Sequence, residues 1–305
     1  MARYVLRRAL WSLVTLVGIL SVSFLILHLS GDPVAMLVSA DATPEEVAQL
    51  RAALGLNRPL QVQYLDFFAK ALHGDFGTSF RYHVPAMGVV LERIPATFQL
   101  MLAGLAVTVL VAFPLGVAGG VRPGSWIDRV SQVWAAAGQA TPGFFLGVMM
   151  IYLFAVYLRL LPASGRAGLD SYLMPSVVLG VYGAAPLTRL LRSALRDVLS
   201  RDYIRTARSK GLAESVVLLR HALKNALIPV VTVLAIQIGV LLSGSVITET
   251  VFAWPGMGRL VVQAVENHDL PVVQAAVCFT GAVILVLNFL VDICYGWLDP
   301  RIRLG

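Results

Sequence analysis

The residue types that carry out catalysis or hold metals are sparse and scattered in this sequence. The five histidines lie far apart, without the spacing of metal ligands: His28, His73, His83, His221 and His268. No His-Glu-x-x-His, Gly-x-Ser-x-Gly or Gly-x-x-x-x-Gly-Lys pattern occurs, so the common zinc, serine-nucleophile and phosphate-loop signatures are missing. We therefore expect no catalytic residue, no metal and no cofactor in this chain.

A different chemistry, that of protein contact, is indicated between residues 189 and 228. Leucines are interspersed with arginines there, and residues 202–212 read Asp-Tyr-Ile-Arg-Thr-Ala-Arg-Ser-Lys-Gly-Leu. We predict one or two turns of helix, a break at Gly211, and a further helix over residues 214–228. Such a compact knob, joined to the helices on both sides, could pass a displacement into the rest of the protein. The alternative is an ordinary basic loop.

Membrane-spanning helices are the elements that must position this knob. The chain is 58% hydrophobic and 13% charged, whereas soluble domains carry roughly a quarter of their residues as charges. Six apolar runs approach or exceed the ~20 residues that cross a hydrocarbon core: residues 9–28, 98–121, 130–158, 172–188, 225–248 and 271–291. The run over 172–188 is the weakest, because it is short and holds two prolines. The sequence therefore predicts an all-α integral membrane protein with six transmembrane helices.

The net charge of +7 could indicate nucleic acid as a partner. The charges lie in the gaps between the apolar runs, however, so we expect a lipid bilayer and no nucleic acid. Arg3, Arg7 and Arg8 precede the first run, which could also be a secretory signal. Signal peptides have apolar cores of about 7–15 residues, and the longer run here favours a retained first span.

The basic residues also predict an orientation. Lysine and arginine accumulate in cytoplasmic loops, and 16 of the 24 fall at the two termini and in the second and fourth gaps. We therefore expect both termini in the cytoplasm.

The first gap, residues 30–97, is expected to form an extracytoplasmic helical insertion. Thr43-Pro44-Glu45-Glu46 is a capping-box start, and Gly55 supplies a stop. A second helix is predicted after Pro59, before Gly74. The insertion is either a folded spacer or a docking surface for a partner.

Ionisable groups are nearly absent from the apolar runs, and Glu249 and Asp292 fall near run ends. Carriers driven by protons or sodium place acids or histidines at mid-membrane depth. Energy for active transport would therefore have to come from a partner.

At these residues the sequence resembles the inner-membrane permeases of binding-protein-dependent ATP-binding-cassette (ABC) importers, in the dipeptide, oligopeptide and nickel branch. In that family the loop before the penultimate span carries a Glu-Ala-Ala…Gly signature; Gly211 matches its glycine, and Arg205, Thr206 and Ala207 occupy the Glu-Ala-Ala positions. Six further stretches resemble landmarks of the first permease subunit of peptide importers: residues 31–34, 74–80, 93–97, 141–145, 249–258 and 299–303.

The resemblance implies a type I importer permease fold, with one permease domain over residues 1–305 and a coupling loop over 189–228. It implies a bacterial inner-membrane location, a second permease, two ATPases that bind ATP and Mg²⁺, and an extracytoplasmic binding protein. The coupling loop would contact an ATPase through these residues: Arg205, Thr206, Ala207, Lys210, Gly211 and Leu212. Peptides are the expected substrates, with nickel or glutathione as alternatives.

The translocation pathway is predicted to use the third and fifth spans. Its expected lining is Gln139, Pro142, Gln237 and Ser243, and hydrogen bonding between helices is the alternative role for the polar ones. Two other functions stay open: a self-contained secondary carrier, and a membrane-embedded enzyme or assembly subunit.

Overall fold

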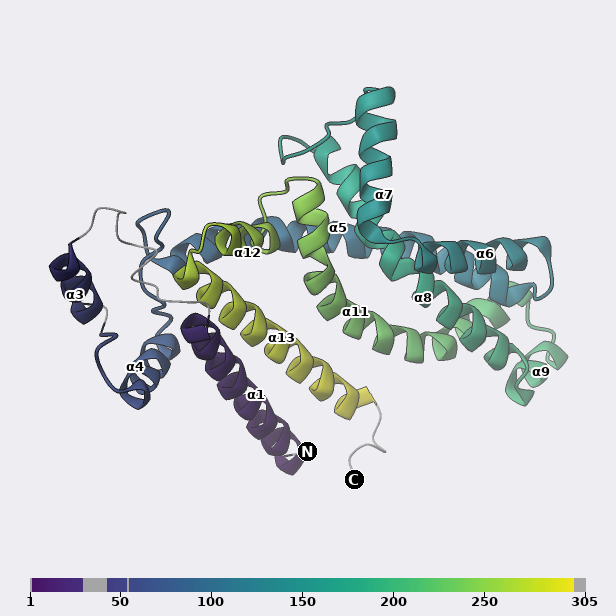
Figure 1. Cartoon of the computed structure of the whole chain (residues 1–305). Coiled ribbons are helices and arrows are strands. Elements are labelled where there is room, and N and C mark those ends of the chain that lie inside the picture. Colours follow the sequence, from purple (N-terminus) through teal and green to yellow (C-terminus); the bar gives the residue numbers. More distant parts are fainter. Residues whose placement is uncertain (1, 30–42, 54, 299–305) are drawn as a thin grey trace. The chain divides into compact units, whose positions relative to one another are not determined.

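The computed structural model of the protein describes residues 2–29, 43–53 and 55–298. The chain divides into two compact units (Figure 1). The first comprises residues 1–95 and 260–305, and the second comprises residues 96–259. The described residues form helices joined by loops, with an isolated antiparallel bridge between Thr78 and Pro85. The prediction of one permease domain over residues 1–305 stays a prediction.

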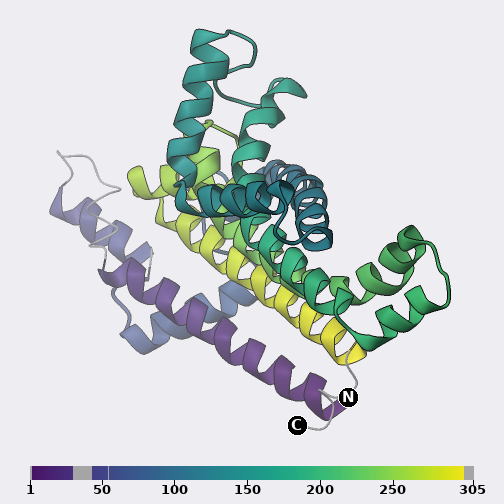
Figure 2. The ribbon, with the colours of Figure 1, turned by 90° about the vertical axis from the view of Figure 1, so that its right-hand side faces the viewer.

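The first unit is built on two long apolar helices, α1 (Ala2–Leu29) and α13 (Leu270–Leu298). They lie side by side in both ribbon views (Figures 1 and 2). Their close approach depends on Gly281, where an added Cβ would lie 2.6 Å from Ile19 Cδ1. The Gln274 side chain donates to the Ser23 carbonyl at 3.3 Å, so one buried polar pair adds to the apolar contact.

The insertion of the first unit contains two short helices, α3 (Pro44–Ala53) and α4 (Leu60–Leu72). The predicted capping box is confirmed: the Thr43 amide donates to Glu46 Oε2 at 2.9 Å, and the Glu46 amide donates to Thr43 Oγ1. Gly55 follows α3 with a φ of 72°. The expected second helix after Pro59 is also confirmed, and it contacts α1 through the Tyr64 and Phe24 rings, whose centroids are 5.3 Å apart.

A buried carboxylate holds the loop between α4 and α5 (Ala86–Val121) against the start of α13. Asp269 immediately precedes α13 and is 1% exposed. Its Oδ2 accepts from Ser79 Oγ at 2.5 Å, and its Oδ1 accepts from the Phe80 amide at 3.1 Å. Ser79 and Phe80 belong to the recognised stretch 74–80, so this stretch is a structural fastening within the first unit.

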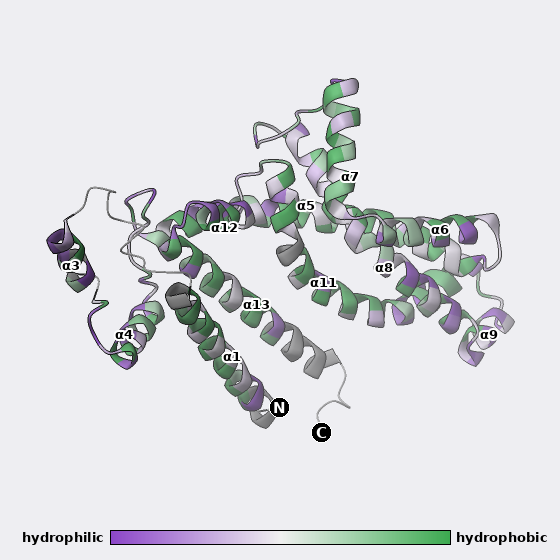
Figure 3. Ribbon diagram, viewed as in Figure 1, coloured by the Kyte–Doolittle hydropathy of each residue, from purple (hydrophilic) through white to green (hydrophobic). Residues whose placement is uncertain are grey.

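The second unit is a helical bundle in which α8 (Leu173–Leu199) packs against α6 (Trp126–Ala140) and α11 (Lys224–Val251). The other elements are α7 (Gly143–Met150), the π-helix η1 (Ile151–Tyr157), the 3₁₀ turn η2 (Asp170–Tyr172), α9 (Asp202–Ser209), α10 (Glu214–Val216) and the π-helix η3 (Val217–Leu223). The helix α12 (Met257–Glu266) crosses from this unit to the first. Apolar residues dominate the long helices (Figure 3).

The predicted spans are recovered with two corrections. Among the described residues, five helices are long and apolar enough to cross a membrane, or up to six if one bent pair counts as a span. The run 130–158 is not one straight helix, because α6 and the α7–η1 helix meet at 99°. Pro142 lacks an amide donor and disfavours helical geometry at the preceding residue, and Thr141 has an extended ψ of 120°.

The second correction concerns the fourth run. α8 does not stop near Thr188 but continues to Leu199, with Pro186 inside it. The weak span and the first helical part of the following loop are therefore one continuous helix. In the same way α11 passes through Pro229 without ending, so both helices that flank the loop extend beyond the apolar runs.

Close packing of α5 on α8 predicts a sensitive position at Gly180. An added Cβ would lie 2.5 Å from Val107 Cβ and 2.8 Å from the Gly104 carbonyl oxygen. We expect Gly180→Ala to destabilise the protein by about 1–3 kcal/mol through overpacking, measured by thermal unfolding in detergent. Gly88→Ala is the matched control, since nothing lies within 4 Å of its Cβ position. Equal stability of the two variants would contradict this packing.

Candidate functional site: the knob between α8 and α11

The knob, residues 202–216, connects the end of α8 to the π-helix that enters α11. It contains α9, the turn at Gly211 and α10. Figure 1 shows α9 beside the end of α8. No segment longer than four residues separates α8, α9, α10, η3 and α11. The knob is thus tied to two long helices by short connections, as the sequence predicted.

The inner face of α9 is buried against these neighbours. Ile204 is fully buried and Ala207 is 6% exposed. Both belong to one apolar cluster with Leu195 of α8, Val217 and Ala222 of η3, and Ala226 of α11. Burying a side chain of the size of Ile204 contributes about 1.5–3 kcal/mol. The knob is therefore held to the bundle by packing as well as by the chain.

Ala207, one of the predicted coupling residues, lies on the buried face of α9. Its side chain belongs to the apolar cluster. It lies three residues after Ile204, on the same face of the helix. A small residue here lets α9 lie close to the bundle, and the predicted contact of Ala207 with an ATPase stays a prediction.

The other predicted coupling residues lie on the exposed surface of the knob: Arg205, Thr206, Lys210, Gly211 and Leu212. Arg205 Nη1 lies 3.8 Å from Asp202 Oδ1, and 82% of the Arg205 side chain is exposed. Thr206 Oγ1 donates to the Asp202 carbonyl of its own helix. The exposed surface therefore combines basic, small and apolar side chains, which suits contact with a protein surface.

Gly211 produces the break that the sequence predicted. Its φ is 77°, a value that glycine adopts without steric cost, and its amide donates to the Arg208 carbonyl at 2.9 Å. Arg208 then reaches across the turn, with Nε 3.1 Å from Glu214 Oε2 and Nη2 2.5 Å from Oε1. This two-point contact raises the pKa of Arg208. It bridges the turn between α9 and α10.

A second ion pair joins α6 to α8 and was not found by sequence reasoning. Asp128 is 2% exposed and accepts from both Nε and Nη2 of Arg192, the latter at 3.0 Å. The Gly124 amide also donates to Asp128 Oδ2 at 2.9 Å. A buried charge needs such pairing to be tolerated. Arg192 lies on α8 one turn before Leu195, which belongs to the apolar cluster under the knob.

The structure describes the side chains of three of the four predicted pathway residues. Gln139 is exposed and accepts from Arg189 Nη2 at 2.8 Å, and Pro142 is exposed at the bend between α6 and α7. Gln237 is 7% exposed and donates to the Gly183 carbonyl at 3.3 Å, which is the alternative helix-to-helix role. The side chain of Ser243 lies outside the described residues. A pathway role for these residues stays a prediction.

At the far end of α11, a buried carboxylate ties this helix to α5. Glu249 is fully buried, and its Oε1 accepts from Thr97 Oγ1 at 2.7 Å. Thr97 Oγ1 in turn accepts from the Met257 amide at 2.7 Å, while the Arg259 amide donates to Glu249 Oε2 at 3.1 Å. Thr97 and Glu249 therefore fasten the loop between α11 and α12 to α5; we call this pair the Thr97–Glu249 latch.

Two further features complete the latch. Trp254 is fully buried, and its Nε1 donates to the Ala96 carbonyl at 2.9 Å. An added Cβ on Gly256 would lie 2.3 Å from Glu249 Cδ, so glycine permits the close approach. Ala96 and Thr97 of the stretch 93–97 thus contact the stretch 249–258, which was recognised separately in the sequence. The stretches 31–34 and 299–303 lie outside the described residues.

Comparison with known protein families now identifies the chain. Residues 112–304 match the model of the inner-membrane component of binding-protein-dependent transport systems, and residues 1–109 match the model of the N-terminal part of such a membrane component. The chain belongs to this family. It is a multi-pass inner-membrane permease, as the sequence predicted.

Curated relatives match the permease over its whole length. The glutathione transport system permease protein GsiC of Salmonella choleraesuis (strain SC-B67) is 40% identical, and the dipeptide transport system permease protein DppB of Escherichia coli (strain K12) is 37% identical. Each alignment covers 99% of both chains. The predicted type, an ABC importer permease of the peptide branch and of the first-subunit kind, is therefore confirmed.

Solved structures show the same fold. An inward-facing structure of the MetNI methionine ABC transporter has a TM-score of 0.59 at 19% identity, covering 70% of the permease and 97% of that chain. An amino acid ABC transporter solved with histidines has a TM-score of 0.53 at 15% identity, covering 68% and 92%. The predicted type I importer permease fold is confirmed.

The latch generates a test on the permease. Thr97→Val removes one hydroxyl that serves both Glu249 and the Met257 amide, and each buried group left unsatisfied costs about 1–3 kcal/mol. We expect a clear loss of thermal stability in detergent. Thr250→Val is the control, because Thr250 is exposed and its hydroxyl bonds only to its own helix at Val246. The same stability for both variants would refute the latch.

Proposed function

We propose that this permease forms half of a translocation pathway for short peptides, driven by ATPases that act on the knob. The observation that carries the substrate class is the match over 99% of both chains to permeases named for dipeptide and for glutathione transport. Glutathione is itself a small peptide, so the two names share one chemistry. Nickel chelates are the alternative substrate.

The assembly that we propose follows the family. This permease pairs with a second, homologous permease, receives substrate from an extracytoplasmic binding protein, and contacts one of two ATPases. ATP and Mg²⁺ bind to the ATPases, and this chain performs no reaction. Both termini lie in the cytoplasm, which places the knob on the ATPase side. The excess of lysine and arginine at the two termini and in the second and fourth gaps supports this orientation.

The mechanism is a two-state equilibrium that nucleotide shifts. A ligand moves such an equilibrium only through contacts that differ between the two states. ATP binding would bring the ATPases together and move the knob with them. Because α9 is packed on Leu195 and Val217, the displacement reaches α8 and α11 instead of being lost in a flexible loop. Alternation between inward- and outward-facing states then follows from helix movement.

The experiment that tests the proposal starts from the complex purified under mild conditions from its native membrane. We expect a second permease and two ATPases to co-purify, and the complex in vesicles to take up a labelled dipeptide or glutathione only with ATP and binding protein. Arg205→Glu should reduce ATPase recovery and uptake by about tenfold or more, equivalent to ~1.4 kcal/mol, because it reverses an exposed charge on the knob.

The matched control is Arg81→Glu, another exposed arginine, which lies in the predicted extracytoplasmic insertion. It should leave ATPase recovery unchanged. Full ATPase recovery with Arg205→Glu would overturn the coupling role of this surface. Uptake by the permease alone would instead support a secondary carrier, and uptake of a nickel chelate without peptide uptake would change the substrate class.

A further inference from the structure

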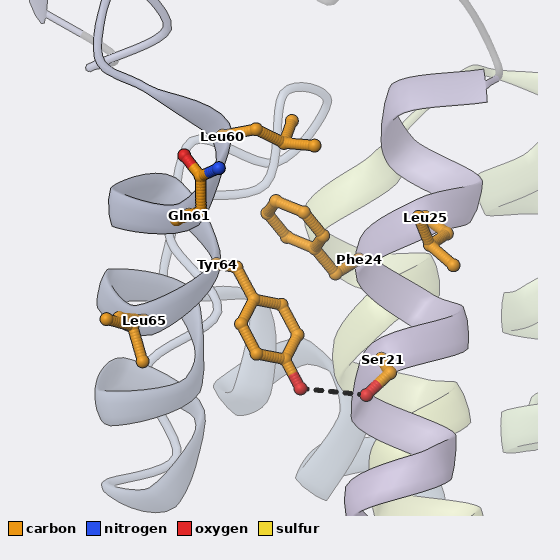
Figure 4. A pocket seen from close by; sticks show the side chains of 7 residues that line it. All are labelled: Ser21, Phe24, Leu25, Leu60, Gln61, Tyr64 and Leu65. Carbon is orange, nitrogen blue, oxygen red and sulfur yellow. Dashed lines mark hydrogen bonds between the residues drawn. The ribbon is translucent and has the colours of Figure 1, made fainter.

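A groove lies between α1 and α4, within the first unit (Figure 4). α1 contributes Ser21, Phe24 and Leu25, and α4 contributes Leu60, Gln61, Tyr64 and Leu65. The volume is about 440 Å³, within the range of ~300–1,000 Å³ typical of sites for small molecules. The groove is thus large enough for a ligand, and five of its seven lining residues have aromatic or aliphatic side chains.

One wall of the groove is rigid because aromatic side chains interlock behind it. Phe24 is 4% exposed and lies between two rings of α4, with centroids 5.3 Å from Tyr64 and 5.7 Å from Phe67. Tyr64 also contacts Phe68, and Phe67 contacts Phe76 beyond the helix. Packed rings therefore hold α1 and α4 together beside the groove.

The hydroxyls in the groove already have partners. Ser21 Oγ donates to the Val17 carbonyl of its own helix at 2.7 Å. It lies 2.8 Å from the Tyr64 hydroxyl, and because its only proton is used, Tyr64 is the donor of this second bond. Both hydroxyls are thus satisfied within the protein. An occupant needs no polar group to pair with them.

The position of the groove along α1 indicates which class of apolar ligand it could bind. The apolar span of α1 runs over Leu6–Ile26, so Ser21 lies five residues inside its end, about 7.5 Å at the helical rise. Leu25 of the same segment is 49% exposed, and on α4 the exposed fractions are 53% for Leu60 and 65% for Leu65. Leu25, Leu60 and Leu65 are therefore exposed apolar side chains near one end of the apolar span.

We propose that this groove binds one acyl chain of a membrane phospholipid, in the leaflet where α1 ends. The apolar side chains Leu25, Leu60 and Leu65 contact the chain, and the exposed amide of Gln61 meets the ester region of the same lipid. α4 is then an interfacial helix held to the first span by a lipid as well as by its aromatic contacts. This site is independent of the transported substrate and of the knob.

The test measures phospholipid retained by the purified complex after extensive detergent washing. We expect the wild-type permease to keep phospholipid, and Leu60→Trp, which fills the groove, to retain one phospholipid fewer per permease. Leu72→Trp is the matched control, because Leu72 is an exposed leucine of the same helix outside the groove. No retained phospholipid in the wild type, or equal loss in both variants, would overturn the proposal.

A second measurement tests the same proposal if the Leu60→Trp variant does not fold. A photoreactive benzoylphenylalanine replaces Leu65 in the otherwise native complex, in vesicles of phosphatidylethanolamine and phosphatidylglycerol. The expected product is the permease carrying the mass of one phospholipid. A cross-link to another polypeptide would show that a partner subunit occupies the groove and would contradict the lipid site.

Discussion

Through Ile204 and Ala207, the short helix α9 packs against the end of α8 and the start of α11. The proposed transport mechanism depends on that contact. In the proposed mechanism the driving force enters mechanically, through contact of the ATPases with α9. α9 presents a basic, exposed surface on one side, and its other side shares an apolar cluster with Leu195 and Val217. A displacement of α9 is therefore transmitted to the helices of the bundle on which it packs.

Other contacts in the second unit hold the long helices together, so that a displacement of α9 would move them as a group. Asp128 and Arg192 fasten α6 to α8 one turn before the cluster. Thr97 and Glu249 fasten α5 to the opposite end of α11. Between these ties, Gly180 allows α8 and α5 to approach closely. The two polar pairs lie at helix ends, and tight apolar packing lies between them. We therefore expect these helices to move as rigid bodies more readily than to bend.

Much of this arrangement can be predicted from the sequence, because the signals are local. The spans follow from hydropathy, the Thr43 capping box from four adjacent residues, and the break at Gly211 from the conformational freedom of glycine. The right-angled bend at Pro142 was missed because hydropathy measures length and not direction. The inward face of Ala207 was missed because α9 is only eight residues long, too short to reveal which side is buried. The latch joins residues 152 positions apart, and no local pattern in one sequence indicates such a pairing.

The rigidity of the knob can be measured by double electron–electron resonance on the assembled importer. One spin label replaces Ser209 of α9 and another replaces Ile236 of α11, in a permease whose two native cysteines are changed to alanine. The mechanism predicts one narrow distance distribution that is the same with and without ATP, while the distance from Ser209 to the knob of the second permease shortens with ATP. A Ser209–Ile236 distribution that is broad, or that shifts with nucleotide, would contradict a knob that moves as one body with its helices.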